Sequence, residues 1–144
     1  MTIDVLVIDD DIAVTDLLTV LLKSQGFTPM TSNSGEEGLK LIRENRPGIV
    51  ILDLMMPGMD GWEVCKNVRT FSNVPIIVLS ALNDPSMVAS VLDAGADDYL
   101  TKPAPSSVLV AHINRLVSRV GTGRLRRTRT GELKKAVTGS LATK

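Results

Sequence analysis

Continuous apolar runs alternate with amphipathic segments along the first 120 residues of the chain. Four-residue apolar runs occupy positions 5–8, 49–52 and 76–79, and weaker strand-like segments lie at 27–31 and 97–101. Strands that are apolar at every position are usually buried on both faces, as in a parallel sheet covered by helices. The pattern therefore predicts five strands of one parallel sheet.

The segments between these runs carry apolar residues at helical spacing. Helices are predicted at residues 12–25, 34–44, 61–70, 85–94 and 106–120. The first should bury Val14, Leu17, Leu18, Leu21 and Leu22, and the fourth Met87, Val88, Val91 and Leu92. Ser34 can cap the second helix, with Glu37 completing a capping-box pattern. Gly58 and Gly61 are interpreted as turn residues.

Strict alternation of strand and helix predicts the fold class. Such an order is typical of α/β proteins with a parallel sheet, and five strands are too few for an eight-stranded barrel. The simplest remaining architecture is a doubly wound five-stranded parallel sheet in the flavodoxin-like order 2-1-3-4-5, with helices on both faces.

Polar side chains follow the strands where their carboxyl ends should meet. Asp9 and Asp10 follow the first strand, Asp53 follows the third, Ser80 follows the fourth and Lys102 follows the fifth. Open α/β sheets form their sites at this edge. Carboxylates gathered there repel one another, and a hard dication with oxygen ligands removes the conflict. We expect Mg²⁺, or Mn²⁺, at this position.

Carboxylates, a metal, a lysine and a hydroxyl are together typical of phosphoryl transfer. Lys102 and Ser80 can each hold an oxygen of a bound phosphoryl group. An ionised carboxylate needs no general base to attack phosphorus. Asp53 is the predicted acceptor because it stands alone on a central strand, whereas Asp9 and Asp10 are paired, as metal ligands would be.

Four motifs built on these residues resemble the receiver domain of two-component response regulators. They are Val-Leu-Val-Ile-Asp-Asp-Asp at 5–11, Leu-Asp-Leu-Met-Met-Pro-Gly-Met-Asp-Gly at 52–61, Val-Leu-Ser-Ala at 78–81, and Gly-Ala-Asp-Asp-Tyr-Leu-Thr-Lys-Pro at 95–103. One motif alone is a weak signal, but four in order at strand ends are a strong one. The resemblance covers residues 3 to about 120.

The resemblance implies a role for each residue at the strand ends. Asp53 is similar to the phosphoacceptor and Lys102 to the cation that binds the phosphoryl group. Asp10 resembles a direct metal ligand, Asp9 a ligand acting directly or through water, and the Met55 backbone carbonyl a further ligand. The phosphoryl donor would be a sensor histidine kinase or a histidine phosphotransfer protein.

The resemblance also implies a conformational switch rather than an enzyme. Ser80 is similar to the switch hydroxyl and Tyr99 to the switch aromatic, although Tyr99 can equally be an ordinary packed residue. A downstream protein would bind the face formed by residues 85–94, 97–101 and 106–120. Autodephosphorylation should be slow because Met55 and Leu82 are apolar. The Lys102–Pro103 bond is a candidate cis peptide.

Two positions depart from the family pattern. Ala104 stands where Phe often follows Lys-Pro. Asp97, Asp98, Arg115 and Arg119 resemble charges with which one branch of transcription factors dimerises. Val88 occupies the place of the matching basic residue, so that dimer is in doubt.

Charge divides the chain into two regions. The first 121 residues carry 9 basic and 15 acidic residues, a net charge of −6, whereas the last 23 carry 7 and 1, a net of +6. We interpret residues 1–121 as the receiver domain and residues 122–144 as a mobile basic tail, the only part expected to contact nucleic acid.

Composition favours a cytoplasmic protein. No apolar run approaches the ~18 residues of a membrane span, so we expect no membrane partner. Cys65 is the only cysteine and sits on an apolar helical stripe, which suits a core position in a reducing compartment.

Three alternatives to a phosphorylated receiver remain. An aspartate-nucleophile phosphatase needs a second acid two residues after the nucleophile, where this chain has Met55. A DNA-associated regulator would act through residues 122–144. A pseudo-receiver would never accept phosphate, and the intact acidic set argues against it.

Overall fold

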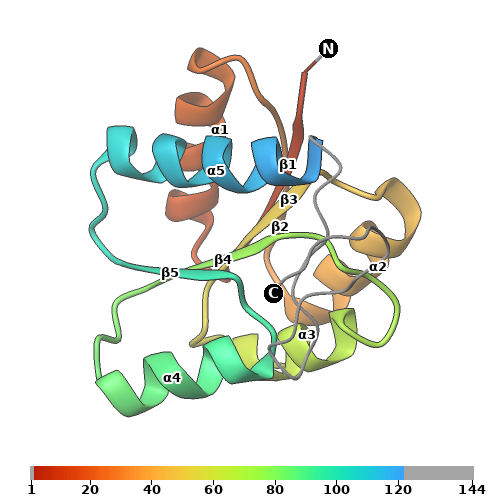
Figure 1. The fold of residues 1–144 in the computed structure, drawn as a ribbon, viewed down its shortest axis with the longest axis vertical. Coiled ribbons are helices and arrows are strands. Elements are labelled where there is room, and N and C mark those ends of the chain that lie inside the picture. Colours follow the sequence, from red (N-terminus) through yellow and green to blue (C-terminus); the bar gives the residue numbers. More distant parts are fainter. Residues whose placement is uncertain (1, 122–144) are drawn as a thin grey trace, which may run out of the picture.

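The parallel sheet has the predicted strand order. The computed structural model describes residues 2–121. Its strands are β1 Asp4–Ile8, β2 Thr28–Ser32, β3 Ile49–Leu52, β4 Ile76–Ser80 and β5 Asp98–Thr101. They pair in parallel in the order β2-β1-β3-β4-β5 (Figure 1). The expected α/β fold class is confirmed, with the second strand shifted by one residue.

Helices cover both faces of this sheet. They are α1 Ile12–Ser24, α2 Gly35–Asn45, α3 Gly61–Val68, α4 Pro85–Ala94 and α5 Ser106–Gly121. α1 and α5 lie on one face, and α2, α3 and α4 lie on the other (Figure 1). Val5 and Val7 of β1 belong to the first core layer, and Leu6 and Ile8 belong to the second. Burial on both faces explains why the strands are apolar without alternation.

The helix starts follow local capping chemistry. The Asp11 side chain caps α1 by accepting from the Ala13 backbone amide at 2.9 Å. Ser34 caps α2, but the predicted reciprocal half is wrong, because the Glu37 carboxylate accepts the Ser32 hydroxyl instead. A complete capping box forms at α3 between Asp60 and Glu63, a pair whose spacing we had not used.

Two helices bury fewer apolar residues than predicted. Leu17 of α1 is 69 % exposed, although Leu18 next to it is buried. Only Val91 of α4 is buried, and Met87 and Leu92 are 39 % and 41 % exposed. Adjacent residues of a helix lie about 100° apart around its axis, and the side of α1 that packs on the sheet includes Leu18 but not Leu17. Cys65 lies in the core, as expected.

Two expectations concern the limits of the chain and the membrane. The proposed mobile basic tail at 122–144 lies outside the described residues. From residue 2 to residue 121, the structure contains no helix with the length and hydrophobicity that crossing a bilayer requires.

A buried arginine ties the α3–β4 connection to β5. The Arg69 side chain is 3 % exposed, and its Nη2 lies 2.9 Å from the Asp97 carboxylate. It also donates to the carbonyl oxygens of Gly95, Ser72 and Val74 at 2.8–3.2 Å. Asp97 in turn accepts the Ile76 backbone amide. One guanidinium therefore connects segments that are 28 residues apart in the chain.

We expect Arg69→Met to lower the free energy of unfolding by about 3 kcal/mol, because breaking a buried pair removes the charge and donors that its partners need. Urea denaturation followed by circular dichroism measures this loss. The matched control is Arg115→Met, whose ion pair with Asp98 is 54 % exposed on the arginine side and should cost about 1 kcal/mol or less. Equal losses in the two variants would contradict the assignment.

Candidate functional site

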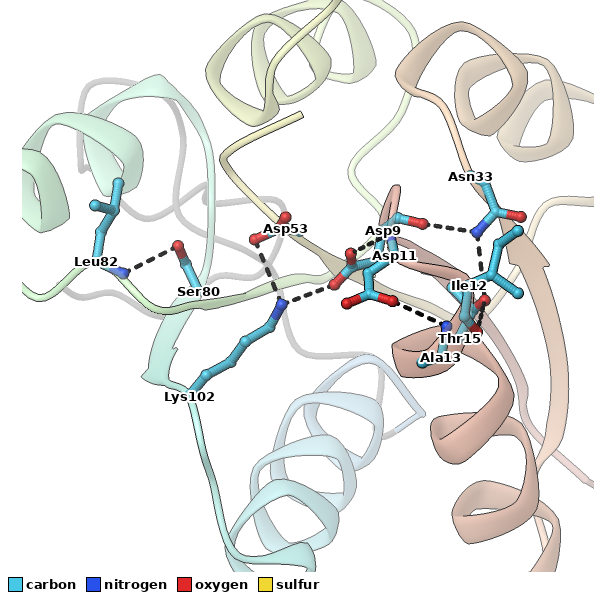
Figure 2. Close-up of polar contacts among 10 residues, drawn as sticks. All are labelled: Asp9, Asp11, Ile12, Ala13, Thr15, Asn33, Asp53, Ser80, Leu82 and Lys102. Carbon is cyan, nitrogen blue, oxygen red and sulfur yellow. Dashed lines mark hydrogen bonds and ion pairs between the residues drawn. The ribbon is translucent and has the colours of Figure 1, made fainter. Parts of the chain in front are cut away.

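The carboxyl ends of β1 and β3 bring two aspartates beside one lysine. Asp9 follows β1 and is 3 % exposed, and Asp53 follows β3 and is 8 % exposed. Lys102, just after β5, places Nζ 2.8 Å from Asp9 Oδ2 and 3.7 Å from Asp53 Oδ1 (Figure 2). Residues from three separate strands therefore converge at the predicted edge.

Asp10 completes a group of three acids. One carboxylate oxygen from each of Asp9, Asp10 and Asp53 lies within 4.8 Å of the other two. Asp10 is exposed, and Asp9 already accepts the Asp11 amide on Oδ1 and Lys102 on Oδ2. Three carboxylates exceed the charge of one ammonium, and all-oxygen donors suit a hard cation. The acidic pocket can therefore hold a divalent metal ion.

The charge balance of the pocket shifts both of its central groups. Burial, and next the negative charge of Asp9, raise the pKa of Asp53 above its usual 3.8, although Lys102 acts in the opposite direction. Burial alone would lower the pKa of Lys102, but its hydrogen bond to Asp9 and the charge of Asp53 outweigh burial and raise that pKa. The ionised form of Asp53 is therefore disfavoured in the folded protein, and a bound cation would stabilise it.

The predicted switch residues meet at the backbone of Leu82. Ser80 is 1 % exposed, and its hydroxyl oxygen accepts the Leu82 amide at 3.3 Å, so it points toward Leu82 and away from Asp53 (Figure 2). The Tyr99 hydroxyl donates to the Leu82 carbonyl oxygen. The Lys102–Pro103 bond is cis, as expected. One peptide segment therefore contacts both side chains.

Close packing at the start of α3 positions Asp53, a feature that sequence reasoning missed. A methyl group on Gly61 would lie 2.7 Å from the Asp53 carbonyl oxygen and 2.7 Å from Leu54 Cα. The Gly61 amide also donates to the Leu54 carbonyl oxygen at 2.9 Å. Gly61 is therefore the first residue of α3, and the interpretation of Gly61 as a turn residue was wrong. Gly58, with φ +74°, does have a turn conformation. The capping-box spacing of Asp60 and Glu63 could have indicated that a helix begins at Gly61.

Asn33 is a second residue that sequence reasoning missed. Its side-chain amide donates to the Asp9 carbonyl oxygen at 2.8 Å and to the Thr15 hydroxyl at 3.3 Å (Figure 2). It therefore holds the end of β1 against α1 and fixes the backbone of Asp9. No sequence pattern marked it, because its partners are 24 and 18 residues away.

Met55 lies two residues after Asp53 and has a side chain that is 59 % exposed. Of the residues predicted for the site, Asp9, Asp10, Asp53 and Lys102 are brought together, and Ser80 borders them with its hydroxyl turned away. The metal-binding role of the Met55 carbonyl stays a prediction.

Comparison with known proteins identifies relatives for most of the chain. Residues 5–114 match the family model of the response regulator receiver domain. The chain is 46 % identical to the transcriptional regulatory protein AfsQ1 of Streptomyces coelicolor over 114 residues, which are 79 % of this chain and 51 % of AfsQ1. It is 43 % identical to the DNA-binding response regulator MtrA of Mycobacterium tuberculosis over 109 residues, 76 % and 48 % of the two chains.

A solved structure agrees with these sequence relatives. The receiver domain of the Francisella response regulator 1452 superposes with a TM-score of 0.79 at 34 % identity, covering 83 % of this chain and 99 % of that one. The chain spans about half the length of the curated relatives it matches.

The raised pKa of Asp53 predicts a gain in stability for Asp53→Asn. A carboxyl whose folded-state pKa exceeds the unfolded value stabilises the fold below 3.8 and loses that stabilisation as pH rises through the folded value. Without metal, Asp53→Asn should therefore melt at a higher temperature at neutral pH, and the difference should shrink toward pH 3.8.

Thermal melts in chelating buffer across this pH range measure the effect, with the exposed Asp93→Asn as the matched control. Adding Mg²⁺ should narrow the difference in melting temperature, because a bound cation stabilises the original protein, with its Asp53 carboxylate, more than the Asp53→Asn variant. If Asp53→Asn melted at or below the temperature of the original protein, at neutral pH without metal, the ionised Asp53 carboxylate would not destabilise the fold.

Proposed function

Because the chain belongs to the response regulator receiver domain family, we propose that it is a phosphorylation-dependent switch that accepts a phosphoryl group on Asp53. The phosphoryl donor would be a sensor histidine kinase or a histidine phosphotransfer protein. The observation that carries this proposal is the buried Asp53 carboxylate, 3.7 Å from the Lys102 ammonium and beside the carboxylates of Asp9 and Asp10. We assign the function to residues 1–121.

The reaction requires positioning more than covalent chemistry. A carboxylate oxygen of Asp53 attacks phosphorus, so an oxygen–phosphorus bond forms. The phosphorus–nitrogen bond of the phosphohistidine breaks, and its electron pair stays on the imidazole. Lys102, now 2.8 Å from Asp9, can turn its ammonium toward a phosphoryl oxygen.

We propose Mg²⁺, or Mn²⁺, as the metal of this site. Asp10 and Asp53 would be direct ligands, Asp9 would act directly or through water, and the Met55 carbonyl oxygen would be a further ligand. When bound, the cation neutralises charge on the phosphoryl oxygens. The oxygen-only donor set within 4.8 Å supports this choice.

The switch would operate through Leu82. A phosphoryl group on Asp53 offers an acceptor to the Ser80 hydroxyl, which would turn away from the Leu82 amide that it now contacts at 3.3 Å. Leu82 also accepts the Tyr99 hydroxyl, so its peptide links the pocket to β5. Phosphorylation would shift the equilibrium between two existing conformations of the face formed by α4, β5 and α5, and a downstream protein would bind one of them.

Phosphorylation should add one phosphoryl group to the chain and require metal. Incubation with a small phosphodonor and Mg²⁺, followed by mass spectrometry, should show this single addition, and chelation should abolish it. Asp53→Ala should remove it entirely, whereas the matched variant Asp93→Ala, an exposed acid of α4, should retain it. Labelling that persists in Asp53→Ala would move the acceptor to another residue.

The phosphorylated state should be long-lived. Met55 and Leu82 lie two residues after Asp53 and Ser80, and their side chains are apolar and cannot orient a water molecule for attack on phosphorus. Met55→Asn should shorten the half-life, followed as loss of the added mass, whereas Met87→Asn, an exposed methionine of α4, should not. A half-life of only seconds in the original protein would contradict this expectation.

A second candidate is a DNA-associated regulator acting through residues 122–144. The name of the relative MtrA describes a DNA-binding response regulator, and the tail has a net charge of +6. Low-salt DNA binding that disappears when residues 122–144 are removed would favour this candidate. For either candidate we propose a cytoplasmic location, which a chain with a single cysteine suits.

A further inference from the structure

A pocket of about 390 Å³ lies at the edge of the sheet opposite to Asp53. It is formed where α2 ends before β3 and where the connection from α3 leads into β4. These segments precede the amino ends of their strands, whereas Asp53 follows a carboxyl end. The lining combines apolar and cationic side chains: Ile42, Pro47, Phe71, Val74, Arg43 and Arg46.

Both arginines of this pocket leave their charge available. The Arg43 guanidinium stacks over the Phe71 ring at 4.4 Å from its centroid, and neither Arg43 nor Arg46 has a carboxylate within 4.0 Å among the residues that the structure describes. The carboxyl end of α2 contributes only about half a negative charge. Two guanidinium groups outweigh it, so the pocket is locally positive on a body whose net charge is −6.

The walls of the pocket are held in place by the rest of the fold. Arg69 donates to the carbonyl oxygens of Ser72 and Val74, which fixes the segment that follows Phe71. At the other wall Arg46 has φ +47° and is followed by Pro47, whose ring restricts the chain. A preformed apolar pocket with a few polar groups is the usual form of a small-molecule site.

We propose that this pocket binds a small organic anion, a single carboxylate attached to an apolar body. Arg43 and Arg46 would hold the carboxylate, since guanidinium groups match its planar geometry. Ile42, Phe71 and Val74 would cover the apolar body. The volume lies near the lower end of the ~300–1,000 Å³ range of ligand pockets, which suits a small molecule. This site is independent of phosphorylation at Asp53.

Titration of the ¹⁵N-labelled full chain with 3-phenylpropionate tests the proposal by amide chemical-shift changes. We expect saturable shifts at the amides of Arg43, Phe71 and Val74, with binding weakened by added salt. The neutral 3-phenylpropionamide tests the need for charge, and acetate tests the need for an apolar body. Both should bind more weakly than 3-phenylpropionate.

Three variants locate the binding energy. Arg43→Gln and Arg46→Gln should each weaken binding of 3-phenylpropionate about tenfold, the usual effect of losing a hydrogen bond to a charged group. Lys66→Gln removes an exposed charge from α3 outside the pocket and should leave binding unchanged. Phosphorylation by a small phosphodonor should be the same in all three variants, which separates this site from the Asp53 site.

Specific results would overturn the proposal. They are an absence of shifts at the pocket, equal shifts with the amide or with acetate, and equal weakening by Lys66→Gln. Binding confined to the residues around Asp53 would likewise assign the anion to the other edge of the sheet.

Discussion

The site depends on the repulsion between carboxylates that the sheet brings together. Asp9 and Asp53 follow neighbouring strands, β1 and β3, and cannot move apart without disturbing the central pairing of the sheet. Asp10 adds a third negative charge within 4.8 Å. Lys102 offsets part of this charge, but burial, and next the negative charge of Asp9, still raise the pKa of Asp53. A divalent cation would supply the positive charge that such an acidic pocket lacks.

The surrounding structure holds these groups in a fixed frame. Strands buried on both faces give the aspartates a rigid base, and Gly61 lets α3 begin directly against the Asp53 backbone. Asn33 fixes the end of β1 on the opposite side of the pocket. Rigid placement of charge is what phosphoryl transfer requires, because its catalysis is mostly positioning and electrostatic stabilisation.

Two sets of polar contacts connect the rest of the sheet to β5, one at each end of the strands. Leu82 contacts Ser80 through its amide and Tyr99 through its carbonyl oxygen. At the other edge of the sheet, Arg69 connects the α3–β4 segment to Asp97 just before β5. Asp98, which follows Asp97, contacts Arg115 and His112 of α5 within the chain. The face of α4, β5 and α5 is thus connected to the sheet at both the carboxyl and the amino ends of the strands.

The sequence by itself determined the elements, their order and the end of the sheet at which the polar side chains gather. Apolar runs and helical spacing are local patterns, so they predicted the five strands, the five helices and the strand ends that carry Asp9, Asp53 and Lys102. Local patterns were less reliable where one helix face had to be chosen, as the exposed Leu17 shows.

Only the tertiary structure decided which groups touch. Lys102 pairs with Asp9, 93 residues away, the Ser80 hydroxyl turns toward Leu82, and Gly61 meets the Asp53 backbone. Arg69 forms a buried ion pair with Asp97 that no sequence motif predicted. The physical reason is that contacts between distant segments depend on how helices pack on the sheet, to within a fraction of an ångström, whereas residue spacing carries only the periodicity of each element.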